Sequence, residues 1–229
     1  MSADLRQLVT ESSRILGSVD HGDLIWGHSS ARDTRDRGAW IKGSGWGLEE
    51  ITPERVQLVS PNGEVLDGDG PRHSEYPIHT EILASRPDVG GVVHTHSPHA
   101  VALAASGQAL RPVSHAANLF SPHGVPRFDR TADLILTREL GSAVAETLGR
   151  ADAVFLVNHG IITVGPTLQA ATVAAVILER AAEQQLLTQG FGGLPSWSDA
   201  VESAAKKEHI YNPAALEQVW QYLLRRVRG

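Results

Sequence analysis

The chain has 229 residues, 41% of them hydrophobic and 20% charged, which are the length and composition of one ordinary globular domain. Its 20 Lys and Arg residues against 26 Asp and Glu residues give a net charge of −6, which offers no basic surface for nucleic acid or for an anionic membrane. The lack of cysteine excludes disulfides, cysteine nucleophiles, and thiolate ligands for zinc or iron–sulfur clusters.

The N-terminal segment predicts a helix, because apolar residues recur at helical spacing from Leu5 to Leu16 and Ser2 is available as a cap. Charged residues are interspersed among them, so this segment is neither a signal peptide nor a membrane span. No later stretch approaches 18 apolar residues. We therefore expect a soluble, cytoplasmic protein.

Turn-forming residues divide the segment from 24 to 96 into short elements. The elements predicted there are strands at 24–30 and 39–42, a hairpin of 57–60 with 64–66 around Pro61-Asn62-Gly63, a helix from Tyr76 to Ala84 that Arg86-Pro87 ends, and a buried strand from Gly91 to His96.

The C-terminal half predicts mainly helices. The elements are a helix at 99–105 that Ser97-Pro98 caps and starts, a loop with short strands over 107–129, a helix at 132–148, strands at 153–157 and 161–164, and helices from Pro166, at 197–208 and at 213–226. Hairpins mixed with helices predict one α/β domain in three layers, over residues 1–229, with a mixed or mostly antiparallel sheet and with 196–229 as a helical tail.

Histidine is the residue type that stands out. The chain has eleven histidines against three tyrosines and four phenylalanines, and eight of the eleven lie between residues 73 and 159. With no thiol available, this histidine-rich middle is where a metal ion is expected.

His94 and His96 stand two apart at the end of a predicted strand, so their imidazoles face the same side of the sheet. His159 also ends an apolar strand, and Gly160 allows a close approach after it. Three imidazoles that leave one coordination position open are typical of a catalytic metal site. The alternative, surface or satisfied core histidines, is the weaker interpretation for all three together.

Glu75 comes before the helix that leads into the strand of His94. A carboxylate beside a divalent ion could be a fourth ligand and an acid or base, and a glutamate favoured by the helix dipole is an equally good interpretation. His79 follows one helical turn later and would either orient Glu75 or pack, with packing preferred.

The combination of these motifs resembles the class II aldolase/adducin family. The residues that carry the resemblance are Ser74-Glu75-x-x-x-His79, Arg86-Pro87-Asp88, Val92-Val93-His94-Thr95-His96 and Asn158-His159-Gly160. The resemblance implies an α/β/α sandwich, metal ligation by His94, His96 and His159, and an acid/base role for Glu75. It also implies a homotetramer with active sites at the subunit interfaces.

The loops that hold phosphate in sugar-phosphate members of this family differ here. The corresponding segments are Gly27-His28-Ser29-Ser30, Lys42-Gly43-Ser44-Gly45 and His73-Ser74-Glu75. Ser44, Gly45 and Ser74 keep the family pattern, whereas His28 replaces an asparagine and His73 a serine. Together with Ser29 and Lys42 they form a larger and more basic pocket, which suits a carboxylate-bearing, planar substrate. Arg32 is either a further substrate contact or part of a solvated loop.

The favoured function is a divalent-metal-dependent decarboxylase of a hydroxylated aromatic acid, such as a dihydroxyphthalate or dihydroxybenzoate, because the motifs are similar to those of the family's decarboxylases. The alternatives are an aldolase, epimerase or dehydratase acting on a sugar phosphate or small hydroxy-keto acid, a non-catalytic adducin-like domain, and an iron-dependent oxygenase. Mn²⁺ or Zn²⁺ is the expected ion, with Fe²⁺ left open. In the tail, His209 or Tyr211 would reach a neighbouring subunit's site or, as favoured, serve helix packing.

Overall fold

The computed structural model describes residues 2–193 and 196–228. Met1, residues 194–195, Gly229 and the side chains of Ala3 and of Ser2, the predicted cap, lie outside this description. In the described part, no helix combines the length and apolar character needed to cross a membrane.

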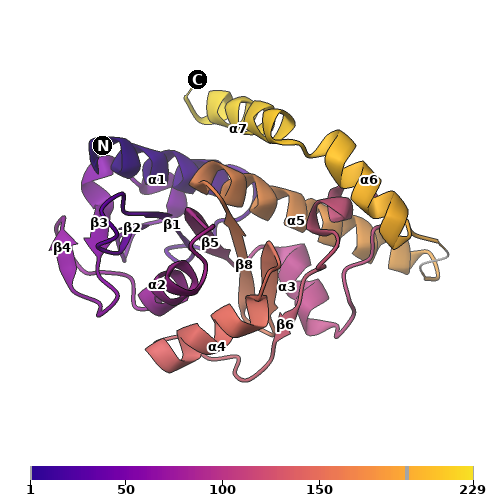
Figure 1. Ribbon diagram of the computed structural model, residues 1–229, viewed down its shortest axis with the longest axis horizontal. Helices are drawn as coiled ribbons and strands as arrows, with labels where there is room; N and C mark the ends of the chain where they lie inside the picture. Colours follow the sequence, from indigo (N-terminus) through magenta and orange to yellow (C-terminus); the bar gives the residue numbers. More distant parts are fainter. Residues whose placement is uncertain (1, 194–195, 229) are drawn as a thin grey trace.

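One eight-stranded sheet forms the middle of the molecule (Figure 1), in the order β4-β3-β2-β1-β5-β8-β7-β6. Every neighbouring pair is antiparallel except β6 with β7, which confirms the mixed, mostly antiparallel sheet. The strands are β1 (His28–Arg32), β2 (Ala39–Lys42), β3 (Val56–Val59), β4 (Val65–Asp67), β5 (Gly91–Thr95), β6 (Arg127–Phe128), β7 (Ala153–Leu156) and β8 (Gly160–Gly165).

Helices cover both faces of the sheet and complete three layers (Figure 1). Helices α1 and α5 pack on one face, and α2 and α4 pack against each other on the opposite face. The helices are α1 (Ser2–Gly17), α2 (Tyr76–Ser85), α3 (Pro98–Ala105), α4 (Arg138–Leu148), α5 (Leu168–Gly190), α6 (Ala200–Ile210) and α7 (Pro213–Arg228), with shorter 3-10 turns at Leu48–Glu50, Pro53–Arg55 and Ala116–Phe120.

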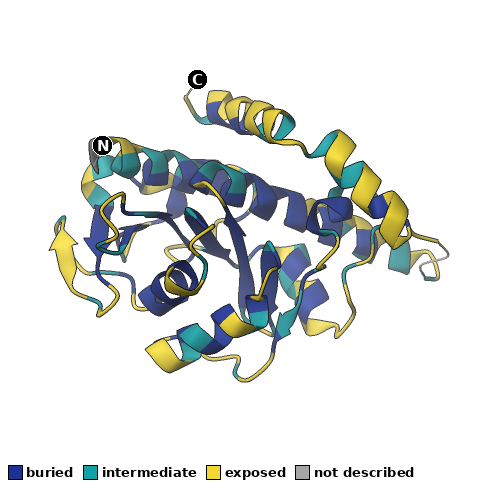
Figure 2. Ribbon diagram, in the orientation of Figure 1, coloured by how far each residue is buried: buried dark blue, intermediate teal, exposed yellow. Residues whose placement is uncertain are grey.

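Alternation along the strands explains why both faces are covered. In β8, Ile161 packs with α3 and α5, whereas Ile162 and Val164 pack with α2 and α4. Since both faces are apolar, neither can be left in water. Figure 2 accordingly shows the central strands buried, and exposed residues concentrated on β4, α6 and α7.

Two predicted boundaries are wrong for tertiary reasons. The strand expected at 24–30 begins only at His28, because Asp23 and Trp26 pair across a tight turn in which Leu24 has a φ of 51°. The helix expected from Ala132 begins at Arg138, where Thr137 accepts the capping hydrogen bond from the Leu140 N–H. The preceding segment instead buries Ile135 in the core against α2 and α4.

Two helix starts also differ in detail. The long helix expected from Pro166 begins at Leu168, with the Thr167 side chain as its cap. The Ser97 side chain makes no capping hydrogen bond to α3. Glu179 of α5 takes over that role, because its carboxylate accepts the N–H groups of His99 and Ala100.

The turn between β1 and β2 is held by one buried carboxylate. Asp33 accepts hydrogen bonds from the Trp40 indole, the Arg37 guanidinium and the Arg35 N–H. The Arg37 hydrogen bonds hold the Asp33 pKa far below its usual range. Arg32, at the end of β1, donates to the carbonyls of Leu83 and Arg86 and ties the strand to the end of α2. It is therefore part of the packing between β1 and α2 and not a solvated loop residue.

We predict that Asp33→Asn lowers the free energy of unfolding by about 2 kcal/mol at pH 7, because donors that face the carboxylate lose their acceptor. A depressed folded-state pKa contributes stability above the unfolded-state value of about 4 and loses it as the pH falls further. The difference from wild type, measured by urea unfolding, should therefore shrink below about pH 4. Asp36→Asn, at an exposed position of the same turn, is the control; an unchanged difference from pH 7 to pH 3 would contradict this account.

Candidate functional site

The register of β1 against β5 places the first two site histidines together. His28 lies directly opposite His94, and their ring centroids are 4.9 Å apart. Both rings lie on the sheet face that α2 covers, and both residues are fully buried. His96 follows the last residue of β5, and His159 lies in the turn between β7 and β8, beside Asn158 with a φ of 58°.

Hydrogen bonds fix the tautomers of His94 and His96. The Nδ1 of His94 lies 2.9 Å from the Ile161 carbonyl, and the Nδ1 of His96 lies 2.9 Å from Asp23 Oδ2. A carbonyl and a carboxylate only accept, so both Nδ1 atoms carry the proton. The two Nε2 atoms then present lone pairs to each other across 3.2 Å.

His159 completes this group from the other side. Its ring centroid is 5.0 Å from that of His94 and 5.4 Å from that of His96. Both of its ring nitrogens are buried and have no hydrogen-bond partner in the described part of the chain. Gly160 allows this approach, since a Cβ there would lie 2.8 Å from a His96 ring carbon and 2.9 Å from a His94 ring carbon.

Glu75 faces three of these rings, those of His28, His94 and His159, from the start of α2. Its Oε1 is 3.7 Å from His159 Nε2, and its Oε2 is 3.9 Å from His94 Nε2 and 3.8 Å from His28 Nε2. Burial raises the pKa of Glu75, although Oε1 accepts a 2.8 Å hydrogen bond from the Ile135 N–H. This carboxyl group is therefore held in place and disposed to keep a proton.

These groups fit one divalent ion. Tetrahedral zinc with imidazole ligands separates two ligand nitrogens by about 3.3 Å, close to the 3.2 Å between His94 and His96 Nε2. Burial holds the pKa of His94 well below its usual range and lowers that of His159 to about 4, which keeps both rings neutral and able to bind. His94, His96 and His159 form one set of converging ligand atoms, and His28, Glu75 and His94 form another. Both sets need His94, whose Nδ1 is already bonded, so they describe one ion and not two.

His28, His79 and His73 form a second histidine group next to this one. His79 does not turn to Glu75 but to His28, with 2.5 Å between His79 Nε2 and His28 Nδ1. His79 Nδ1 lies 2.6 Å from the Ser30 hydroxyl. The His73 ring lies 3.8 Å from that of His28, between centroids, and burial lowers the His73 pKa to about 3. His79 therefore does more than fill space in the core, because it hydrogen-bonds to His28 and Ser30, and Glu75 is not its direct partner.

The structure brings only part of the expected substrate pocket together. Lys42 is buried, its Nζ donates to the Ile25 carbonyl, and burial lowers its pKa to about 8. Its charge also helps to lower the His73 pKa. The loop of Ser44 and Gly45 joins the loop before Glu75, since the Ser44 N–H donates to the Pro71 carbonyl. Ser74 is exposed in that second loop.

Ser29 is the residue that the structure separates from the others. It pairs with Val93 of β5, and its hydroxyl lies 3.3 Å from that of Ser13 in α1. Its side chain therefore faces the opposite side of the sheet from His28. In the tail, Tyr211 packs against the core cluster of α3, α5 and α7, and His209 is exposed.

Sequence reasoning missed three groups that hold the site: Asp23, the Ile135 N–H and the Ser30 hydroxyl. Ile135 lies in a segment wrongly predicted as helix, and Asp23 lies just before the strand wrongly predicted to begin at residue 24. A signal existed only for Ser30, which stands two residues after His28 and therefore shares its face of β1.

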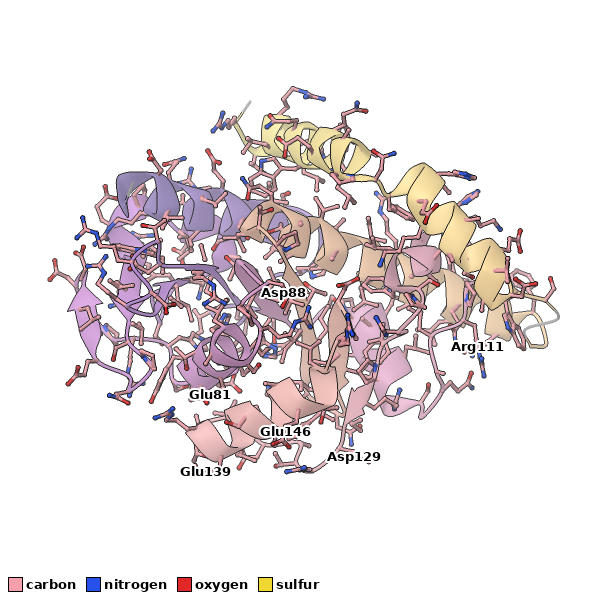
Figure 3. The ribbon with its side chains drawn as sticks, in the orientation of Figure 1. Glu81, Asp88, Arg111, Asp129, Glu139 and Glu146 are labelled. Carbon is pink, nitrogen blue, oxygen red and sulfur yellow. The ribbon has the colours of Figure 1, made fainter. Side chains whose placement is uncertain are left out.

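Glu81 is a second carboxylate on α2, and it joins this helix to α4. Its carboxylate accepts hydrogen bonds from the side chains of Arg138 and Ser142 of α4, and Figure 3 labels Glu81 on α2. The carboxylates of α2 thus divide into Glu75, which faces the histidines, and Glu81, which joins two helices.

Comparison with known proteins agrees with this geometry. The model of the class II aldolase and adducin N-terminal domain matches residues 7–186. The 3,4-dihydroxyphthalate decarboxylase of Terrabacter sp. (strain DBF63) is 30% identical over 215 residues, which are 87% of this chain and 87% of that protein.

Two further relatives extend the comparison. A protein of Streptomyces roseochromogenus subsp. oscitans, 4-hydroxy-3-prenylphenylpyruvate oxygenase/4-hydroxy-3-prenylbenzoate synthase, is 32% identical over 76% of this chain, which spans 58% of it. The solved structure of L-fuculose 1-phosphate aldolase from Glaciozyma antarctica PI12 has a TM-score of 0.87 at 22% identity, over 98% of this chain and 88% of that one. That likeness confirms the fold. The chain therefore belongs to the class II aldolase and adducin family, and it is an enzyme of the lyase class.

Proposed function

We propose that the chain is a divalent-metal-dependent decarboxylase of a hydroxylated aromatic acid of the dihydroxyphthalate or dihydroxybenzoate type, or of a related carboxylic acid. The observation that carries this proposal is the buried Glu75 carboxyl group with its raised pKa, facing both the His94, His96 and His159 cluster and His28. The decarboxylase relative at 30% identity supports the same substrate class.

Metal binding falls to His94, His96 and His159 in this proposal. A divalent ion bound there would supply a Lewis acid that polarises a substrate oxygen and stabilises the electrons left on carbon. Mn²⁺ or Zn²⁺ is the proposed ion, with Fe²⁺ as an alternative that three imidazoles also accept.

Glu75 supplies the proton. When the carbon–carboxylate bond breaks, carbon dioxide leaves and the bonding electron pair stays on the ring carbon. The Glu75 carboxyl group, whose pKa burial raises, donates its proton to that carbon and is reprotonated from solvent. The net reaction consumes one proton and releases one carbon dioxide.

His28, His73 and Lys42 would hold the carboxylate that is not lost. They enclose one basic corner next to Glu75, and a carboxylate is stabilised there by hydrogen bonds and by the Lys42 charge. Ser44, Gly45 and Ser74 would border this corner from the adjoining loops. A homotetramer with sites at the interfaces remains part of the proposal.

The discriminating experiment is a product assay on chelator-stripped protein reloaded separately with Mn²⁺, Zn²⁺ or Fe²⁺. Dihydroxyphthalate- and dihydroxybenzoate-type acids are offered beside fuculose and ribulose phosphates, and carbon dioxide and aldehyde are detected in parallel. We expect metal-dependent carbon dioxide from an aromatic acid. Aldehyde from a sugar phosphate without carbon dioxide would refute the decarboxylase in favour of an aldolase.

Glu75→Gln should lower kcat at least about a hundredfold, since a general acid contributes that much or more. The variant should keep its metal, because the amide oxygen can still accept from the Ile135 N–H and the three imidazoles are unchanged. The measurement pairs turnover with metal content.

Glu81→Gln is the matched control, a carboxylate of the same helix that pairs with α4. It should keep wild-type kcat once folded. Full turnover by metal-loaded Glu75→Gln would remove Glu75 from the proton step.

A further inference from the structure

Three side chains form a hydrogen-bonded row that ends at the site: Ser30, His79 and His28. The row runs from the Ser30 hydroxyl to His79 Nδ1 over 2.6 Å, and from His79 Nε2 to His28 Nδ1 over 2.5 Å. All three residues are fully buried. The far nitrogen, His28 Nε2, has no hydrogen-bond partner in the described part of the chain and lies 3.8 Å from Glu75 Oε2.

The two hydrogen bonds of the row can be arranged in only two ways, which differ in which residue of each pair is the donor. Burial lowers the pKa of His79 to about 3, so this ring is neutral and has one N–H. Either Ser30 donates to His79 and His79 donates to His28, or both hydrogen bonds are reversed. In the first direction His28 Nε2 carries a proton; in the second it presents a lone pair.

The Ser30 end of the row favours the first direction. His79 is the hydrogen-bond partner of the Ser30 hydroxyl, so a hydroxyl that accepted from His79 would leave its own hydrogen without an acceptor in a buried position. Because Ser30 is buried, the row has no connection to solvent at that end. It can therefore fix the orientation of His28, but it cannot carry protons to solvent.

We infer that Ser30 and His79 are positioning residues that hold His28 with its Nε2–H directed into the site, where it donates a hydrogen bond to an oxygen of the substrate. The substrate class rests on the proposed function, whereas the direction of the row does not. The row also gives His28 a role distinct from that of His94. His94 donates from Nδ1 to a carbonyl and presents a lone pair on Nε2, whereas His28 presents an N–H on Nε2. Two facing histidines thus receive opposite functions: one binds the ion and the other donates.

The direction of the row is measured by NMR of the full-length, zinc-loaded protein with ¹⁵N-labelled histidine. The His28 signals are identified as those missing from His28→Gln. We expect a protonated Nε2 and an unprotonated Nδ1 in wild type. Ser30→Ala removes the hydroxyl that sets the direction, so both tautomers of His28 should appear. A wild-type His28 protonated on Nδ1, or a Ser30→Ala spectrum identical to wild type, would overturn the inference.

A pair of substitutions at His79 separates positioning from mere packing. His79→Gln keeps an acceptor for Ser30 and a donor for His28, whereas His79→Leu keeps only volume. With an aromatic acid as substrate, we expect His79→Leu to raise KM about tenfold, the effect of one lost hydrogen bond, with a smaller change in kcat. His79→Gln should recover most of the loss. Equal impairment of both variants would contradict positioning.

The NMR measurement and the carbon dioxide assay distinguish failure of the hydrogen-bonded row from failure of the proposed decarboxylase function. The NMR measurement needs no turnover, so the expected tautomer in a protein that releases no carbon dioxide would refute the decarboxylase and leave the row established. The reverse tautomer in an active decarboxylase would refute the row alone. Should His79→Leu fail to fold, the wild-type and Ser30→Ala spectra still decide.

Discussion

The antiparallel register of β1 with β5 is the constraint on which the site depends. It sets His28 opposite His94 on one buried face, and a shift of β1 by one residue would turn the His28 ring to the other side of the sheet. The apolar residues of the same strands pack against helices on both faces, so the register that forms the core also forms the site. Stability and function therefore use the same strand pairing.

Burial of so many imidazoles has an electrostatic consequence. Protonated rings at this density would repel each other and lose their hydration, so burial, with mutual repulsion added, holds the pKa values of His28 and His94 well below their usual range and keeps these two rings neutral. Their nitrogens must then be matched one by one. The Ile161 carbonyl and Asp23 fix the protons of His94 and His96 on their outer nitrogens, and the lone pairs of His94, His96 and His159 are left to converge. The Ser30–His79 pair, in the direction inferred above, instead leaves the His28 proton on the nitrogen that faces the site. Lone pairs that converge in this way repel one another when no ion is bound, and they become stabilising when a cation lies between them.

Much of this site follows from strand periodicity and little of it from helix patterns. The two-residue spacing of His94 and His96, and the strand end before Gly160, predict a shared face because alternation is local. Asp23 and Ile135 escape prediction because each lies in irregular backbone defined by contacts far along the chain, 73 residues from Asp23 to His96 and 60 from Ile135 to Glu75. His79 is placed correctly on its helix, but its partner is 51 residues away on β1. Ser29 shows the limit of motif transfer: it stands in the expected segment and faces the wrong side.

The central claim is that one divalent ion bound by His94, His96 and His159 converts these converging lone pairs into a reaction centre. Anomalous diffraction from zinc-loaded crystals tests it most directly. The account predicts a single strong peak about 2.0–2.1 Å from one nitrogen of each of the three rings, with Glu75 adjacent. A zinc-saturated protein with no peak there, or with its peak among other residues, would contradict it.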